Sequence, residues 1–239
     1  MRKLLLVSTS TVHGTGYLDH CADEMKALLG AGVERVLFVP YALFDRDGYT
    51  AKARGRFAAL GCGLDSVHEA TDPAAAVRAA EAVFVGGGNT FRLARELQAQ
   101  GLIEPLRQRA AAGMPYLGTS AGSNVACPTL KTTNDMPIVQ PSSFETLGLV
   151  PFQINPHFID ADPGSTHMGE TRETRLAEFL EENATPVIGL REGAMLRVRG
   201  NSMQLVGLRG AKLFRRGSAA QELPVGADLS WLLVQGCSK

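Results

Sequence analysis

The sequence of 239 residues is long enough to bury a full core and is compatible with one α/β domain or at most two domains. Its 24 basic and 24 acidic residues give a formal net charge of zero, and no block of like charge indicates a nucleic-acid-binding or membrane-binding protein. The apolar run at residues 4–7 is too short for a signal peptide or a membrane span, so it predicts a buried first strand. A small molecule is therefore the expected partner.

The cysteines are scattered along the chain, at Cys21, Cys62, Cys127 and Cys237. They form no C-x-x-C pair and have no set of histidines nearby, so the sequence indicates neither a disulfide framework nor a zinc site. Reduced thiols in a cytoplasmic protein are the simplest expectation.

Short apolar runs alternate with amphipathic stretches through the first half of the chain. The expected strands cover residues 3–10, 35–42, 66–70, 82–88 and 115–120. The expected helices cover residues 17–30, 49–61, 73–81 and 90–101. Continuously apolar strands separated by helices are typical of a parallel sheet covered on both faces, so the predicted fold class is α/β, with a mostly parallel, doubly wound sheet.

The second half begins with an irregular stretch from Pro128 to about Val150. An apolar run at residues 152–158 and one strong helix at residues 171–183 follow it. The last expected segments cover residues 186–190, 194–200, 202–207 and 211–217, and the turn residues between them predict antiparallel strands appended to the main sheet. Since no linker, repeat or low-complexity segment interrupts the chain, a single domain over residues 1–239 is expected.

The expected strand at residues 115–120 ends in the sequence GTSAG, where Ser120 stands between two glycines. Gly-x-Ser-x-Gly at a strand-to-helix turn is typical of a nucleophile elbow, because the glycines remove side chains where strand and helix crowd. The N–H of Ala121 would then point toward the place where an oxyanion forms. A strand-ending turn with a capping serine fits these five residues equally well.

A serine hydroxyl needs a histidine base, and a group that orients the base, before it can act as a nucleophile at neutral pH. His157 stands apart from the other histidines because it follows an apolar run, at a place where Pro156 would enforce an extended backbone. A hydrogen-bonded structural histidine is the alternative interpretation. The remaining histidines lie in expected loops, a helix and a strand, at His13, His20, His68 and His167.

Two carboxylates qualify as the group that orients the imidazole. Asp135 lies in a polar loop downstream of the elbow, and Glu192 follows the apolar strand at residues 186–190. Either carboxylate could accept a hydrogen bond from the histidine and hold its tautomer. Their spacing in the sequence does not decide between them.

Three glycines at residues 86–88 follow a second apolar strand and precede a helix that begins near Asn89 or Thr90. A phosphate-binding loop is disfavoured, because Phe91 stands where G-x-G-x-x-G requires glycine and no Gly-Lys-Ser/Thr follows. The glycines favour an oxyanion loop, in which the N–H of Gly88 approaches the substrate oxygen.

The helix expected at residues 171–183 carries an apolar stripe of Leu176, Phe179 and Leu180, and Arg172 lies on the same face one turn earlier. A guanidinium that points inward needs an anionic partner. That partner is an internal carboxylate or, if the residue is functional, a substrate carboxylate bound by the bidentate fork of arginine. An arginine that extends past the edge of the core is a third interpretation.

Several separated blocks, in this order along the chain, resemble the peptidase E family, the aspartyl dipeptidases of the serine peptidase group that also contains cyanophycinase. The blocks are VGGGNTF, G-x-SAG-x-N-x-ACPT, TTNDMPIV, QINPHF, GETRE-x-R and VIGL-x-EG. They span nearly the whole chain, whereas residues 158–168 and the part after Glu192 match less clearly.

The resemblance implies an α/β fold related to the class I glutamine amidotransferases. It also implies hydrolysis of dipeptides with an N-terminal aspartate through an acyl-enzyme, without metal or cofactor. Small Asp-Xaa peptides are then the expected ligands, nucleic acid and membranes are not expected partners, and a homodimer is left open.

Carried onto this sequence, the resemblance makes Ser120 the nucleophile and His157 the general base. Gly88 and Ala121 would be the oxyanion donors.

The remaining family positions concern the acid and the substrate. Asp135 and Glu192 both stay candidates for the third catalytic residue, because both positions are acidic here. Arg172 would bind the side chain of the substrate aspartate, and Asn89 is taken as a second substrate-binding residue.

Three other functions compete with this interpretation. A cyanophycinase-like exopeptidase is disfavoured by the short chain. An α/β-hydrolase esterase would share the order Ser120, Asp135, His157, but its pocket would have no use for an inward Arg172. A non-catalytic aspartate-binding protein would bind aspartate without turning over any peptide.

Overall fold

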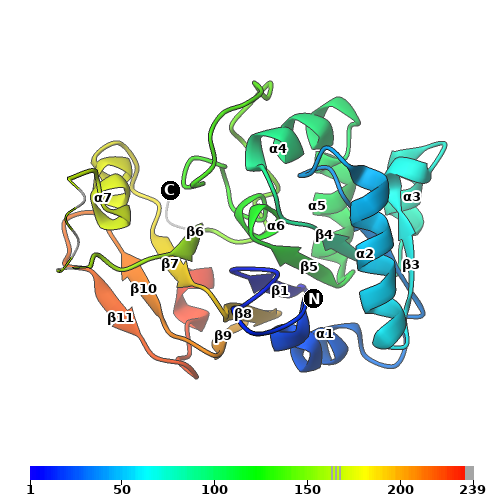
Figure 1. Cartoon of the computed structure of the whole chain (residues 1–239), viewed down its shortest axis with the longest axis horizontal. Helices are drawn as coiled ribbons and strands as arrows, with labels where there is room; N and C mark the ends of the chain where they lie inside the picture. Colours follow the sequence, from blue (N-terminus) through cyan, green and yellow to red (C-terminus); the bar gives the residue numbers. More distant parts are fainter. Residues whose placement is uncertain (163, 165, 167, 235–239) are drawn as a thin grey trace.

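The computed structural model describes residues 1–162, 164, 166 and 168–234. Two β-sheets and the helices around them make up this part of the chain (Figure 1). His167 and Cys237, which the sequence analysis considered, lie outside the described residues.

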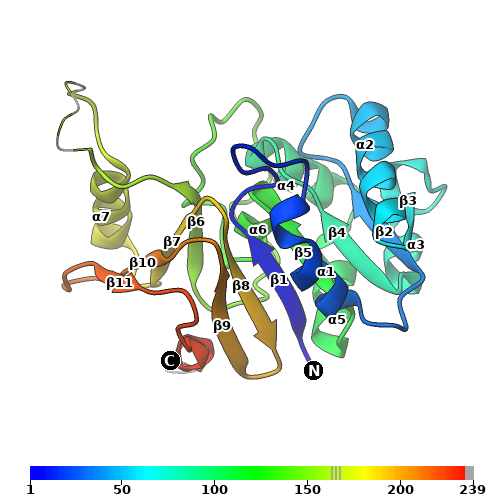
Figure 2. The same cartoon turned by 60° about the horizontal axis from the view of Figure 1, so that its bottom comes forward.

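The larger sheet has seven strands, and five of them run parallel. Its strands are β1 (Lys3–Val7), β2 (Arg35–Val39), β3 (Gly63–Ser66), β4 (Ala82–Val85), β5 (Tyr116–Thr119), β8 (Ala194–Arg199) and β9 (Ser202–Gly207). They are arranged in the order β3-β2-β4-β5-β1-β8-β9, with β8 antiparallel to β1 (Figure 2). The carboxyl ends of β1, β4 and β5 therefore meet at one edge, where ligands collect in open parallel sheets.

Helices cover both faces of this sheet. They are α1 (Ala22–Leu29), α2 (Arg46–Ala59), α3 (Pro73–Ala79), α4 (Thr90–Ala99) and α5 (Ile103–Ala112). In β2, Val36 and Phe38 pack with α1 and α2 on one face, whereas Leu37 and Val39 pack with α3, α4 and α5 on the other. Because successive side chains of a strand point to opposite faces, a continuously apolar strand is buried by helices on both faces of the sheet. The predicted doubly wound α/β fold is confirmed.

A second sheet of four strands carries part of the site. Its strands are β6 (Gln153–Phe158), β7 (Val187–Arg191), β10 (Ala211–Phe214) and β11 (Gln221–Leu223), in the order β11-β10-β7-β6. The helix α7 (Arg172–Glu182) connects β6 to the parallel strand β7. Leu176 and Leu180 of α7 pack against Phe158, Val187 and Phe214, so the predicted apolar stripe of this helix faces the second sheet.

Some details of the expected secondary structure were wrong. The strand β3 ends at Ser66, and Val67–Glu69 with His68 form the 3-10 helix η2 instead of a strand. Strands β8 and β9 join the main sheet, but β7 and β10 belong to the second sheet, because the buried strand β7 pairs with β6. The helix α5 and the strand β11 were not predicted; further 3-10 helices are η1 (Asp19–Cys21) and η3 (Ser230–Leu233).

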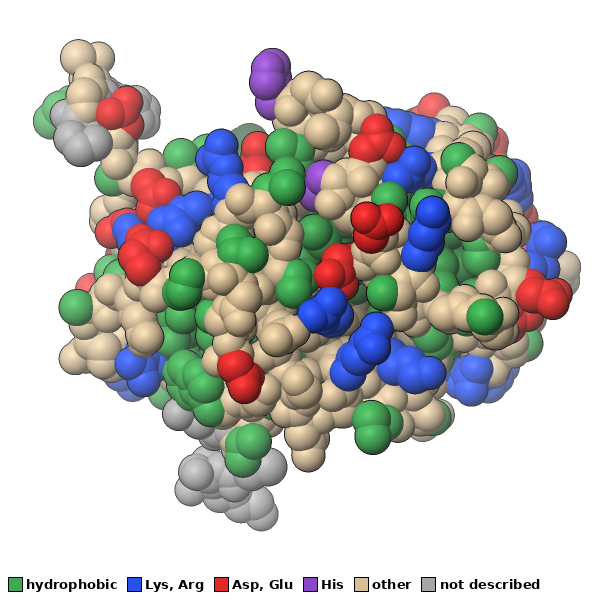
Figure 3. Space-filling view, turned by 90° about the horizontal axis from the view of Figure 1, so that it is seen from below, with side chains coloured by type: hydrophobic (Ala, Val, Ile, Leu, Met, Phe, Trp, Pro, Cys, Tyr) green, Lys and Arg blue, Asp and Glu red, His purple; other side chains and the backbone are tan. Residues whose placement is uncertain are grey.

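In the part of the chain that the structure describes, no helix is both long and apolar enough to cross a lipid bilayer. Acidic and basic side chains are interspersed over the face of the molecule drawn in Figure 3. Positive and negative charges are thus equal in number in the sequence and also intermixed on this face.

Candidate active site

Ser120 lies at the turn between β5 and the short helix α6 (Ala121–Asn124). Its φ of 50° and ψ of −110° are unusual for a residue with a side chain, as expected at a nucleophile elbow. The neighbouring glycines make this turn possible. A Cβ on Gly118 would lie 2.5 Å from the carbonyl oxygen of Gly122, and a Cβ on Gly122 would overlap the carbonyl oxygen of Val85.

His157 lies at an irregularity near the end of β6 and has a φ of 51°. Its backbone N–H donates to Oγ of Ser8 at 3.0 Å, and the Ser8 hydroxyl donates to the carbonyl of Leu190 at 2.7 Å. These bonds connect the ends of β1, β6 and β7. The imidazole points toward the elbow, with Nε2 2.9 Å from Oγ of Ser120.

The structure separates the two candidate acids. Oε1 of Glu192, directly after β7, lies 2.9 Å from Nδ1 of His157. The carboxylate of Asp135 bonds elsewhere, because its Oδ2 accepts hydrogen bonds from the backbone N–H (2.7 Å) and hydroxyl (2.6 Å) of Thr90 and from the hydroxyl of Thr133 (3.1 Å). Asp135 therefore fastens the irregular loop of residues 128–150 to the start of α4, and Glu192 is the carboxylate at the imidazole.

Gly88 and Ala121 both carry backbone N–H groups beside Ser120 in the fold. Neither N–H donates to another group in the described part of the chain. Gly88 has a φ of 134°, and a Cβ there would lie 2.6 Å from the carbonyl oxygen of Ala42. Only glycine fits this position, which is consistent with the expected close approach of a substrate oxygen.

A cleft with a volume of about 570 Å³ opens over the elbow. It holds Ser120, His157 and Gly88 together, so the serine hydroxyl, the imidazole and one expected oxyanion donor line the same space. The other residues that line it are Ser10, Tyr17, Leu43, Asp45, Gly48, Tyr49, Lys52, Gly87 and Asp135.

Arg172 is the first residue of α7 and is half-buried. Burial lowers the pKa of its guanidinium and the positive charge of Arg175 lowers it further, whereas the carboxylate of Asp135 raises it. Arg172 lines a different cavity from Ser120, formed by residues 159–162, 169–172 and 175. Its side chain has no ion pair with any other described residue, so its charge lacks a fixed internal partner.

The side chain of Asn89 is engaged within the protein. Its Oδ1 accepts a hydrogen bond from the N–H of Arg92 at 3.0 Å, which caps α4, and its Nδ2 donates to the carbonyl of Met136 at 2.9 Å. The structure thus places Asn89 as a helix cap that positions Gly88, and not as a side chain turned into the cleft.

A second group of a serine, a histidine and an aspartate lies outside the cleft of Ser120. Its serine is buried, so a substrate cannot reach it. The ring of His68 lies 2.6 Å from Oγ of Ser66 and 2.9 Å from the carboxylate of Asp47. Ser66 is only 3% exposed and itself donates to the carbonyl of Phe38. These hydrogen bonds therefore stabilise the fold. Of the other histidines, His13 is an exposed residue of a turn.

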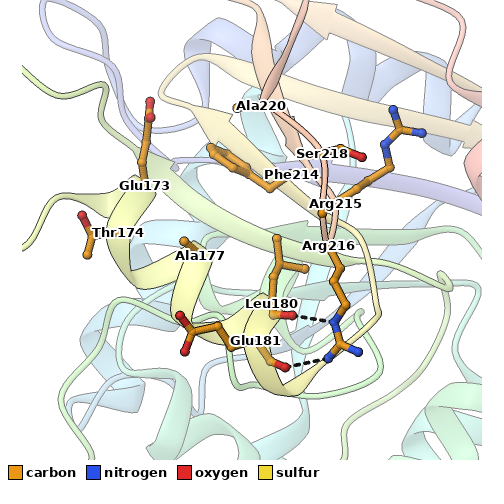
Figure 4. A pocket seen from close by; sticks show the side chains of 11 residues that line it. Glu173, Thr174, Ala177, Leu180, Glu181, Phe214, Arg215, Arg216, Ser218 and Ala220 are labelled. Carbon is orange, nitrogen blue, oxygen red and sulfur yellow. Dashed lines mark hydrogen bonds between the residues drawn. The ribbon is translucent and has the colours of Figure 1, made fainter.

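A further cavity lies between α7 and β10 and contains neither Ser120 nor His157 (Figure 4). At its edge Arg216 donates from Nε to the carbonyl of Leu180 at 2.7 Å and from Nη2 to the carbonyl of Glu181 at 2.9 Å. These bonds satisfy carbonyls in the last turn of α7 and hold in place the helix that begins with Arg172.

Two supports of this site were not expected from the sequence. Ser8 holds the backbone of His157, and Thr90 with Thr133 holds Asp135. Ser8 follows the central strand β1, so its place at the carboxyl edge of the sheet was a usable signal. The contact of Asp135 had no such signal, because it depends on how a long irregular loop folds.

In many α/β hydrolases the serine nucleophile lies on such an elbow beside an imidazole. The fold and the site of this protein are those of that class. Residues 4–206 match the sequence model of Peptidase family S51, so the chain belongs to that family. The protein is thus a serine-type peptidase, and the resemblance seen in the sequence is confirmed.

Individual relatives cover almost the whole chain. It is 61% identical over 230 residues to Peptidase E of Streptomyces coelicolor, covering 96% of this chain and 94% of the relative. It is 49% identical over 234 residues to a Drosophila melanogaster protein named "Probable alpha-aspartyl dipeptidase", covering 97% and 98% of the two chains. The crystal structure of a peptidase from an acI-B1 Actinobacterium shares the fold, with a TM-score of 0.72, 21% identity and coverage of 95% and 96%.

Proposed function

We propose that the protein is a serine dipeptidase that hydrolyses dipeptides with an N-terminal aspartate. The observation that carries this proposal is the continuous contact from Ser120 through His157 to Glu192, with 2.9 Å at each step. The aspartate specificity is supported by the name of the Drosophila relative and by the half-buried Arg172, which forms no ion pair with another described residue.

The geometry supports an acyl-transfer mechanism. His157 accepts the proton of Ser120 at Nε2, and Oγ of Ser120 attacks the carbonyl carbon of the substrate aspartate. The N–H groups of Gly88 and Ala121 stabilise the oxyanion of the tetrahedral intermediate. The amino group of the second residue leaves with the proton from His157, and water then cleaves the acyl-enzyme and releases free aspartate.

Glu192 orients the imidazole in this proposal. A carboxylate at Nδ1 keeps the proton on that nitrogen, so that Nε2 faces Ser120 with its lone pair, and it stabilises the imidazolium that forms. Asp135 takes a supporting role, because its bonds to Thr90 hold the start of α4 and with it the loop of Gly88.

Arg172 binds the side-chain carboxylate of the substrate aspartate in this proposal. The charge of Arg172 interacts with that of Asp135, which lines the catalytic cleft, and its guanidinium is partly desolvated. A partly buried guanidinium gains more from a bidentate carboxylate than an exposed one does.

We also propose a cytoplasmic location. Three buried cysteines, Cys21, Cys62 and Cys127, are free, as is usual where thiols stay reduced.

The test is the release of free amino acids from Asp-Leu, Glu-Leu, Asn-Leu, Ala-Leu and acetyl-Asp-Leu by the wild type and by Ser120→Ala. Cleavage of Asp-Leu alone, with an inactive serine variant, supports the proposal. Cleavage that survives in Ser120→Ala contradicts it. Binding of aspartate without cleavage of any peptide would instead favour a non-catalytic aspartate-binding protein.

A further inference from the structure

One cation of the catalytic cleft has no role in the mechanism above. Lys52, on α2, lines the same cleft as Ser120 and His157. Its Nζ lies 4.5 Å from the ring centroid of Tyr17, which also lines the cleft. This cation–π contact fixes the ammonium at the wall of the cleft without using its hydrogen-bond donors.

No carboxylate within the described ranges forms an ion pair with Lys52. Two carboxylates share its cleft, and both are bonded elsewhere. Asp45 accepts a hydrogen bond from the N–H of Gly48 at 2.9 Å, at the start of α2, and Asp135 is held by Thr90. Lys52 is therefore a positive charge that faces the cleft and is available to an anionic ligand.

Lys52 and Arg172 belong to two different helices, α2 and α7. Their helices α2 and α7 lie on opposite sides of β5 and α6 in both views (Figures 1 and 2). A dipeptide Asp-Xaa carries one carboxylate on each side of its scissile bond, namely the aspartate side chain and the C-terminus of the second residue. Since the proposed function gives the aspartate side chain to Arg172, we assign Lys52, which lines the cleft of Ser120, to the leaving residue.

The short length of a dipeptide fits this assignment of Lys52. The C-terminal carboxylate of a dipeptide is separated from the scissile nitrogen by a single Cα, and successive Cα atoms are about 3.8 Å apart. A dipeptide bound at Ser120 thus keeps its C-terminus inside the same cleft. Leu43, also in the cleft, offers apolar surface to the side chain of the leaving residue.

We propose that Lys52 binds the free C-terminal carboxylate of the leaving residue and so restricts the enzyme to dipeptides. This inference rests on the proposed function. A longer peptide presents an uncharged amide where the carboxylate of a dipeptide would lie, so the ammonium loses its charged partner and the peptide is a poorer substrate.

The test compares Asp-Leu with Asp-Leu amide, which differ only in the C-terminal charge. We expect the wild type to have a kcat/KM at least about 10-fold higher for Asp-Leu, the size of one charge-assisted hydrogen bond. Lys52→Met should lose this preference through a higher KM for Asp-Leu, with its kcat/KM for the amide unchanged. Lys26→Met, which removes an exposed lysine of α1 outside the cleft, should behave like the wild type.

A second variant guards against a general loss of structure. Lys52→Arg keeps the positive charge and should retain the preference for Asp-Leu. Equal cleavage of the two peptides by the wild type would overturn the inference, as would an equal loss on both peptides in Lys52→Met. In these cases Asp-Leu is still cleaved by the wild type, so the proposed function stands. If the wild type cleaves neither peptide, the proposed function and this inference fall together.

Discussion

Oε1 of Glu192 lies 2.9 Å from Nδ1 of His157, on the side of the ring that faces away from Ser120. This contact exists because β6 and β7 are parallel neighbours, so that a residue after β7 lies beside a residue near the end of β6. The carboxylate beside the imidazole thus comes from the end of a strand and not from the polar loop that holds Asp135.

Replacement of Glu192 by glutamine should lower kcat about 100-fold or more while KM changes little, because the imidazole loses its carboxylate partner. The Glu192 side chain is 52% exposed, so water can replace part of the interaction and the loss should be smaller than for a buried acid. Steady-state kinetics with Asp-Leu measure this effect. An unchanged kcat would remove Glu192 from the mechanism.

Asp135→Asn should act mainly on stability. The variant weakens the hydrogen bonds that Thr90 donates to the carboxylate, which should cost about 1–2 kcal/mol of the free energy of unfolding. Urea unfolding gives this quantity, and kinetics on the same sample give kcat. If kcat falls as far as in Glu192→Gln while stability is unchanged, Asp135 is the catalytic acid after all.

Arg172→Ala should reduce the discrimination between Asp-Leu and Asn-Leu by about 10-fold or more, because the substrate carboxylate loses a charged partner. The ratio of the two kcat/KM values measures this discrimination and is insensitive to the fraction of folded enzyme. Arg172→Lys should keep part of it, since the charge remains but the bidentate fork is lost. A ratio that stays at its wild-type value would show that Arg172 does not bind the substrate carboxylate.

Gly122→Ala should destabilise the protein by at least about 2 kcal/mol, because the new Cβ would overlap the carbonyl of Val85 behind the elbow. The matched control is Gly55→Ala in α2, where a Cβ meets no atom within 4 Å. This control should gain about 0.5–1 kcal/mol, as alanine favours a helix interior over glycine. Thermal or urea unfolding of the two variants should move in opposite directions.

Asp160 should make stability depend on pH in the acid range. Hydrogen bonds from Arg191 and then Lys212 lower the pKa of Asp160 from 3.8 to about 2. Between these values the unfolded chain binds more protons than the folded protein, so this contribution is complete above about pH 4 and is lost as the pH falls toward 2. The stability difference between the wild type and Asp160→Asn should therefore shrink over this interval in urea unfolding series. A difference that stays constant with pH would contradict the ion-pair assignment.

Some elements of the fold could not be predicted from the sequence, and the reasons are physical. The helix α5 buries only Leu106 and Ala110, so its apolar periodicity is weak. Residues 66–70 were expected as a strand, but the backbone turns after Ser66 into η2. By contrast, the apolar stripe of α7 and the alternation of strands with helices were strong signals in the sequence. They follow from the regular spacing at which side chains return to the same face of a helix or strand.

The sequence by itself determined the elbow at Ser120, since two glycines around a serine after an apolar strand are local requirements of one tight turn. It also determined the α/β class and the family, through blocks spread over the chain. Only the tertiary structure decided which carboxylate lies beside His157, because the parallel pairing of β6 with β7 brings Glu192 to a ring 35 residues away, while loop packing takes Asp135 to Thr90. The same is true of Lys52, which lines the cleft only because α2 packs on one face of the main sheet.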